Sequence, residues 1–197
     1  MKTIKTTLTT NAVFSDDSKK RYLLTKTWDS SKPNLAIIML APSEASGIAL
    51  DSTTMLVLNN ASRLGYGSVT ILNLFATLND FALREAQMED AENMSIILSA
   101  AKTADVVIYA PGVGKATNKL FQERQKQVLE ALKPDEHKLF CLCDANGNAR
   151  LQHPLSPAVR TWELSPLKVE ELVEQEEPAP QPPKKVTKSA KKDAPAE

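Results

Sequence analysis

Short apolar runs alternate along the chain with segments of helical periodicity, a pattern typical of β-α-β units around a parallel sheet. Four of the runs are apolar almost throughout, as expected for central strands that helices cover on both faces. The central strands are predicted at residues 35–40, 69–74, 105–110 and 138–143.

The segments between these strands predict helices. Asp51 or Ser52 can cap a helix that runs to Leu64, because the apolar stripe continues to that residue and Gly65 stops it. Two further helices are predicted, at residues 79–103 with a break near residue 88 and at residues 116–132.

The first thirty residues predict an antiparallel hairpin at one edge of the sheet. Residues 12–14 and 22–28 have strand composition, and a polar turn over residues 15–20 separates them. Together these elements predict one α/β domain over residues 1–172. It is expected to be a three-layer α/β/α sandwich with a mainly parallel central sheet.

The C-terminal segment, residues 173–197, has a different composition. It lacks apolar periodicity and cannot bury enough surface to offset its ordering entropy, so it is expected to be a disordered Pro/Lys-rich tail. Two roles stay open for it, a basic arm that touches nucleic acid and a solubilising spacer. The lysines of such an arm would be Lys184, Lys185, Lys188, Lys191 and Lys192.

Charge and composition limit the function classes. The 24 basic and 24 acidic residues balance, so any contact with nucleic acid must be local. The N-terminus lacks a signal-peptide core and no run is long enough to span a membrane, so a cytoplasmic protein without membrane contact is expected. The two cysteines are expected to be reduced, and with two histidines they offer no ligand spacing for a metal. No cofactor is predicted.

The unusual residues follow the predicted central strands. In open α/β sheets, ligands bind beyond the carboxyl ends of the strands, where neighbouring loops converge. If the strands are parallel, the loops share one rim. These loops are residues 41–44, 73–75, 111–115 and 144–147, the last followed by residues 153–156.

The loop after the third central strand partly resembles a phosphate loop. Gly112 and Gly114 can turn backbone N–H groups toward an anion, and Lys115 adds charge. The full motif fails, because Tyr109 stands where a glycine is needed and Ala116 stands where Ser or Thr is needed. A tight turn and an anion site without hydrolysis are the remaining interpretations.

His153 lies in a loop that Pro154 and Pro157 stiffen, so its side chain is a candidate for binding or catalysis. Asp51 or Glu44 could act as a base or position a water, although a helix cap also accounts for Asp51. No further motif supports a hydrolase triad.

Asn73 is a polar residue that ends an apolar strand. Its side chain could cap backbone carbonyls or could form hydrogen bonds to a base. Both interpretations stay open.

Several separate segments resemble a family found in bacteria and phages, domain of unknown function 1643. The resemblance covers roughly residues 20–157 in matching order and spacing, and its family name supplies no reaction. The matching segments are residues 21–29, 38–43, 51–53, 65–67, 73–76 and 153–155.

That family is in turn distantly similar to the uracil-DNA glycosylase superfamily, which has a three-layer α/β/α domain. Ala41-Pro42-Ser43 would match the first motif of the superfamily, and His153-Pro154-Leu155-Ser156 would match the late one. The resemblance implies that His153 donates a hydrogen bond to the base and that Leu155 wedges into the duplex. Phe75 and Tyr109 are candidate stacking partners for an extruded base.

Ala41 departs from this resemblance, because those enzymes carry Asp or Asn there to position water. Either Glu44 or Asp51 positions the water instead, or the protein binds a base or nucleotide without cleaving a glycosidic bond. The expected function is therefore a nucleic-acid or nucleobase-processing protein, in one form a DNA glycosylase that acts on a modified base. The alternatives are a non-catalytic nucleic-acid or nucleotide-binding module of a mobile element or phage, and an enzyme of nucleotides or sugar phosphates. The candidate ligand-binding residues are Pro42, Ser43, Asn73, Phe75, Gly112, Gly114, Lys115, Leu155 and Ser156.

Overall fold

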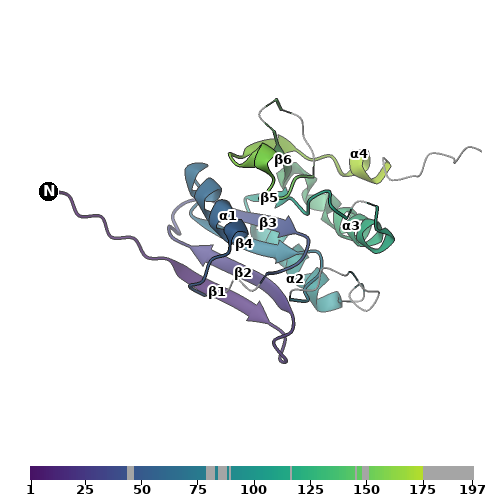
Figure 1. Ribbon diagram of the computed structural model, residues 1–197, viewed down its shortest axis with the longest axis horizontal. Coiled ribbons are helices and arrows are strands. Elements are labelled where there is room, and N and C mark those ends of the chain that lie inside the picture. Colours follow the sequence, from purple (N-terminus) through teal and green to yellow (C-terminus); the bar gives the residue numbers. More distant parts are fainter. Residues whose placement is uncertain are drawn as a thin grey trace, which may run out of the picture.

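One seven-stranded sheet runs through the computed structural model of the protein (Figure 1). The structure describes residues 1–43, 47–78, 83, 88, 90–115, 117–144, 146–147 and 151–174. The strands are β1 (Thr9–Phe14), β2 (Arg21–Thr27), β3 (Asn34–Met39), β4 (Ser68–Asn73), β5 (Val106–Tyr109), β6 (Leu139–Cys143) and β7 (Glu163–Pro166). The α-helices are α1 (Ser52–Arg63), α2 (Ala91–Thr103), α3 (Lys119–Leu132) and α4 (Val169–Glu174).

The sheet has the order β1-β2-β4-β3-β5-β6-β7, and its four central strands are parallel. The predicted mixed α/β domain with a mainly parallel sheet is therefore confirmed, as are all four predicted central strands within a residue or two. Because β4, β3, β5 and β6 run in the same direction, their carboxyl ends meet at one edge of the sheet.

The predicted N-terminal hairpin is also confirmed. β1 pairs antiparallel with β2, and β2 continues antiparallel onto β4. The register shifts between Val13 and Phe14, which pair with Leu23 and Arg21 respectively. This shift is a β-bulge at Tyr22, and a bulge reverses the face toward which the following side chains point.

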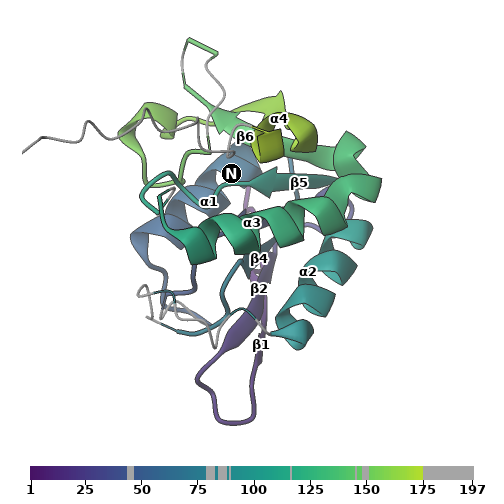
Figure 2. The same ribbon diagram turned by 90° about the vertical axis from the view of Figure 1, so that its right-hand side faces the viewer.

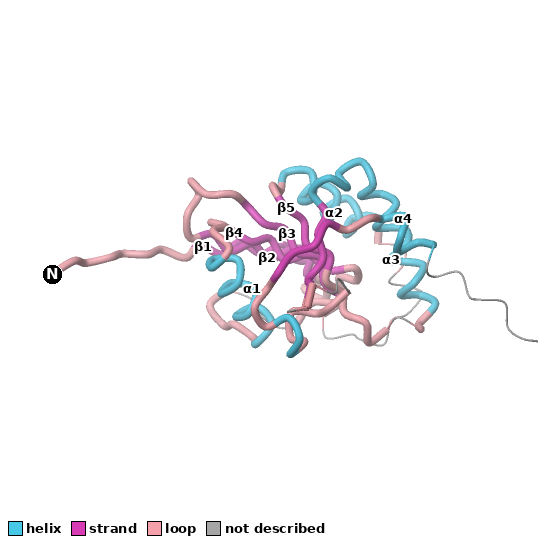
Figure 3. Tube along the Cα trace, turned by 90° about the horizontal axis from the view of Figure 1, so that it is seen from above, coloured by secondary structure: helices cyan, strands magenta, loops and turns pink. Residues whose placement is uncertain are grey.

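Helices lie on both faces of the sheet. Figure 3 shows the strands between α1 on one side and α2 and α3 on the other, and Figure 2 shows α2 and α3 in front of the sheet. Each face has its own apolar core. Val57 and Ala61 of α1 pack on one face, and Ile97 of α2 and Val128 of α3 pack on the other.

The helix ends follow their capping residues. Asp51 caps α1 by accepting from the Thr54 N–H, and Gly65 follows the helix with a φ of +90°, as predicted. α3 begins at Lys119, three residues later than predicted, because the Asn118 side chain accepts from a backbone N–H of the first turn.

The helix predicted over residues 79–103 begins later than predicted. Before residue 91 the prediction is wrong at the positions that the structure describes, residues 83, 88 and 90. α2 begins at Ala91, where Asp90 caps it by accepting from the Asn93 N–H, and Met88 lies in a turn. Helical composition before residue 90 therefore does not form a helix at the described positions. In the described part of the chain, no helix is long and apolar enough to cross a membrane.

Candidate functional site

Two cavities lie at the carboxyl ends of the central strands. The small cavity, about 170 Å³, is lined by Arg21, Met39, Ala41, Ser43, Thr53, Thr54, His153 and Leu155. The large cavity, about 460 Å³, is lined by Leu40, Pro111, Gly112, Val113, Gly114, Lys115, Gln152, His153, Leu155 and Ser156. His153 and Leu155 line both cavities, so the two are neighbours. The structure thus brings the loops after β3 and β5 together with the loop around His153, as the rim argument predicts.

The His153 ring is held by its own loop. The Leu155 N–H donates to His153 Nδ1 across 3.2 Å, so the proton of the neutral ring is assigned to Nε2. Burial lowers the pKa of His153, although the Asp51 charge opposes this shift. The ring is therefore neutral at pH 7, and its Nε2–H is a donor suited to a carbonyl or phosphate oxygen.

Asp51 combines the cap of α1 with a place beside the small cavity. Its carboxylate accepts from the Thr54 N–H at 2.6 Å and from the Ser43 hydroxyl. Burial raises the pKa of Asp51, but the hydrogen bonds from Ser43 and Thr54 and the charge of Arg21 outweigh it and lower the pKa. Asp51 is thus a stable anion next to His153.

Arg21 is a member of the site that the sequence analysis missed. Its side chain is only 2 % exposed, and its Nη1 donates to the Ser43 carbonyl at 3.1 Å. The bulge at Tyr22 explains its direction. Leu23 packs against the core on the α2 and α3 face, and with unbroken alternation Arg21 would point there as well. Instead it lines the cavity on the α1 side.

The large cavity contains the glycine loop for which a tight turn and an anion site were the two interpretations. Gly112 has a φ of +84°, and a Cβ at this position would lie 3.0 Å from the Cβ of His153. A larger residue would therefore push His153 away. Val113 and Leu155 are exposed at the cavity, and Lys115 is the sole charged side chain among its described lining residues, because the His153 ring is neutral.

Asn73 neighbours the small cavity without lining it. It pairs with Met39 across β3 and β4, so the two side chains share the α1 face, and Met39 lines that cavity. The Asn73 side chain is 1 % exposed, and its Nδ2 has no hydrogen-bond partner among the described residues. The carbonyl-capping role belongs to another residue, because Asn93 Nδ2 donates to the carbonyls of Asn73 and Leu74.

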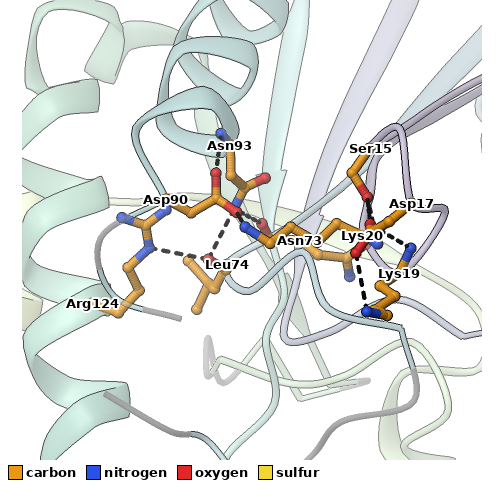
Figure 4. A network of polar contacts seen from close by, with 9 residues as sticks. All are labelled: Ser15, Asp17, Lys19, Lys20, Asn73, Leu74, Asp90, Asn93 and Arg124. Carbon is orange, nitrogen blue, oxygen red and sulfur yellow. Dashed lines mark hydrogen bonds and ion pairs between the residues drawn. The ribbon is translucent and has the colours of Figure 1, made fainter. Parts of the chain in front are cut away.

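A buried polar network surrounds that strand end on the α2 and α3 face (Figure 4). Asp90 forms an ion pair with Lys20 at 2.8 Å, and Arg124 Nε donates to the Leu74 carbonyl at 3.0 Å. Burial lowers the pKa of Arg124, whereas the Asp90 charge opposes that shift. The network holds the end of β4 against α2 and α3. The sequence carries no signal for this network beyond polar residues in otherwise amphipathic helices.

The structure does not bring every candidate residue to a cavity. Phe75 and Tyr109 have no exposed surface and belong to the core, and the Tyr109 hydroxyl donates to Gln125. Neither ring is available for stacking on a base at these cavities, which corrects that expectation. Pro42 is buried in the loop between cavity residues, and Ser156 lines the large cavity. Glu44 lies outside the described residues.

The donor set suits an organic ligand better than a metal ion. Within the described ranges, no group of three His, Cys, Asp or Glu side chains is arranged to hold a metal. The site offers a neutral imidazole N–H, a buried guanidinium and a hydroxyl that is bonded to a carboxylate. These groups can orient a polar planar molecule by hydrogen bonds.

Comparison with known proteins gives a family and no activity. The model of a family described as "Protein of unknown function (DUF1643)" matches residues 21–155. Searches of the curated proteins and of the solved structures found no match. The matched range begins at Arg21 and ends at Leu155, and both residues line the small cavity.

Proposed function

The chain belongs to the DUF1643 family of proteins of unknown function, and we propose that it binds a nucleobase of a nucleic acid or nucleotide in the small cavity. His153 Nε2–H is the donor to the base in this proposal. The protein is then a nucleic-acid or nucleobase-processing protein with the architecture of the uracil-DNA glycosylase superfamily.

One observation carries this proposal. The two segments that resemble the base-binding motifs of that superfamily, 41–43 and 153–156, lie about 110 residues apart in the sequence, yet Ala41, Ser43, His153 and Leu155 line one cavity. The resemblance rests on residue identities, whereas the cavity follows from the fold, and both select the same residues.

The chemistry of the cavity supports a base as the ligand. Nucleobases carry carbonyl oxygens and ring N–H groups in one plane, and a neutral Nε2–H can donate to such an oxygen without adding charge. The exposed Leu155 at the cavity can fill the place of an extruded base. The Nδ2 of Asn73 has no partner among the described residues, and Asn73 lies beside Met39, a lining residue, on the neighbouring strand, so this amide is a candidate second donor.

Binding without cleavage is the second candidate, and Ala41 favours it. A methyl group cannot orient a water, and the carboxylate of Asp51 is already bonded to Ser43 and Thr54. A DNA glycosylase acting on a modified base would have to use Asp51 or Glu44 for this step. The two candidates differ in whether an abasic site forms.

The test uses the full chain and DNA oligonucleotides that contain uracil or one of a panel of modified bases. Binding is measured by fluorescence anisotropy, and abasic sites are measured by cleavage in alkali. We expect His153→Ala to weaken binding about tenfold, because one hydrogen bond to the ligand is worth about 1 to 1.5 kcal/mol. The control is His137→Ala, an exposed histidine remote from both cavities. Equal binding by His153→Ala and the unmodified chain would refute the assignment of His153.

A further inference from the structure

The large cavity adjoins the proposed base site, and nothing in that proposal fills it. We propose that it binds a phosphate group on the sugar of the bound base, with Lys115 as the cationic contact, so that the ligand is a nucleotide unit rather than a free base. The nucleotide identity of the ligand rests on the proposed function, whereas the binding of a phosphate in the large cavity does not depend on it.

Charge in the large cavity favours an anion. Lys115 lines it, and none of its described lining residues is an Asp or Glu. Gln152 and Ser156 add neutral groups that can donate hydrogen bonds, and they lie on the same loop as His153. A phosphate oxygen accepts hydrogen bonds from all of these groups.

The backbone of the loop after β5 suits the same ligand. Its residues from Pro111 to Lys115 line the cavity continuously, and Gly112 adopts a left-handed φ of +84°. Successive residues of alternating hand turn their N–H groups toward one side, which creates a concave site for an anion. Pro111, Val113 and Leu40 supply apolar surface against which a sugar ring can pack.

The two cavities share His153 and Leu155, and the turn at Gly112 lies against His153. His153 lines both, and its Cβ lies where a Cβ on Gly112 would come within 3.0 Å. The turn that shapes the phosphate site therefore also sets the position of the base donor. At about 460 Å³, the large cavity is within the usual range of about 300 to 1,000 Å³ for small-molecule sites, whereas the small cavity can hold only part of a ligand.

The first experiment tests the phosphate site without any base. The full chain is labelled with ¹⁵N and titrated with inorganic phosphate at constant ionic strength, and the amide signals of Gly112 and Gly114 are followed. We expect saturable shifts in the unmodified chain and a loss of at least tenfold in affinity in Lys115→Gln. Lys119→Gln is the matched control. It removes the same charge four residues further along the chain, and the Lys119 side chain is exposed and does not line the cavity. Equal titrations of Lys115→Gln and the unmodified chain, or the absence of saturable shifts, would overturn the inference.

The second experiment separates this inference from the proposed function. Calorimetry compares a panel of nucleosides with their 3′- and 5′-monophosphates and with short single-stranded oligonucleotides. We expect the monophosphates to bind at least tenfold more tightly than the nucleosides, and Lys115→Gln to abolish this difference, whereas the control Lys119→Gln keeps it. Nucleoside binding that phosphate does not improve would refute the phosphate site alone. Phosphate binding without nucleoside binding would refute the base site alone. A preference for the oligonucleotide over both monophosphates would identify a strand as the source of the phosphate.

Discussion

Replacement of Asp51 separates its role as a helix cap from its role as a charge. Asparagine is nearly as good a helix cap as aspartate, so Asp51→Asn costs only a few tenths of a kcal/mol at the helix end, whereas Asp51→Ala costs about 1 kcal/mol there. Both substitutions remove the anion beside the buried Arg21 guanidinium. Removing one member of a fully buried pair costs about 3 to 5 kcal/mol. Because Asp51 keeps part of its surface in water, we expect about 1 to 2 kcal/mol for this charge effect.

The pH dependence of the unfolding free energy distinguishes the charge of Asp51 from its helix-cap hydrogen bond in a second, independent way. The pKa of Asp51 is lowered in the folded protein from its ordinary value of about 3.9, because burial, which raises it, is outweighed by hydrogen bonds and by Arg21. A depressed carboxyl pKa contributes stability that is fully present above the unfolded value and is lost as the pH falls through the folded value. The asparagine variant lacks this contribution. The difference in unfolding free energy between the unmodified chain and Asp51→Asn should therefore shrink below about pH 4.

Urea unfolding followed by circular dichroism at pH 7, 5 and 3.5 measures these differences. We expect Asp51→Asn to lose about 1 to 2 kcal/mol at pH 7, and Asp51→Ala about 1 kcal/mol more. A difference between Asp51→Asn and the unmodified chain that stays constant from pH 7 to 3.5 would show that packing, not charge, accounts for the loss. Equal stability of the two variants would show that the cap hydrogen bond to Thr54 contributes nothing.

Two further predictions concern the scaffold. The buried Asn60 accepts from the backbone N–H of the buried Trp162 and donates to the Arg160 carbonyl, both at 3.0 Å, so Asn60→Ala leaves the buried Trp162 N–H unpaired and should cost about 1 to 3 kcal/mol in urea unfolding. The exposed Asn59→Ala on the same helix is the control, and an equal loss in both would contradict this account. Burial raises the pKa of Cys141 to about 11, so iodoacetamide at pH 8 should label it only as fast as the protein unfolds; rapid labelling of the native chain would refute its inaccessibility.

The sheet could be predicted from the sequence because its central strands are apolar almost throughout. Residues that helices cover on both faces leave no alternation to interpret, so their boundaries were correct within a residue or two. The helix α1 was predicted for a similar reason, since Asp51 and Gly65 mark its ends by local rules. The start of α2 was missed because helical composition continued before Asp90, and composition does not reveal which of several polar residues forms the cap.

The candidate site could be predicted only in part. His153, Asp51 and Lys115 could be selected because they lie in or near loops that follow parallel strands, and such loops converge at one edge of the sheet. Arg21 was missed because its direction depends on a bulge, and a single extra residue in one strand leaves no trace in hydrophobic periodicity. Phe75 and Tyr109 were assigned too readily to the ligand, because position near a strand end does not reveal whether a ring is buried in the core or faces a cavity.

Ala41 does not by itself remove the capacity to hold a water at this site. An ionised carboxylate offers about four acceptor positions. Asp51 uses three of them, one for the Ser43 hydroxyl, one for the Thr54 N–H and one for the Thr54 hydroxyl. About one acceptor position of the carboxylate is then left, and one water is the number that hydrolysis of a glycosidic bond consumes. In the glycosylase form of the proposed function, Asp51 would have to position that water in place of Ala41, and its lowered pKa would make it a weak base that positions water better than it takes a proton from it.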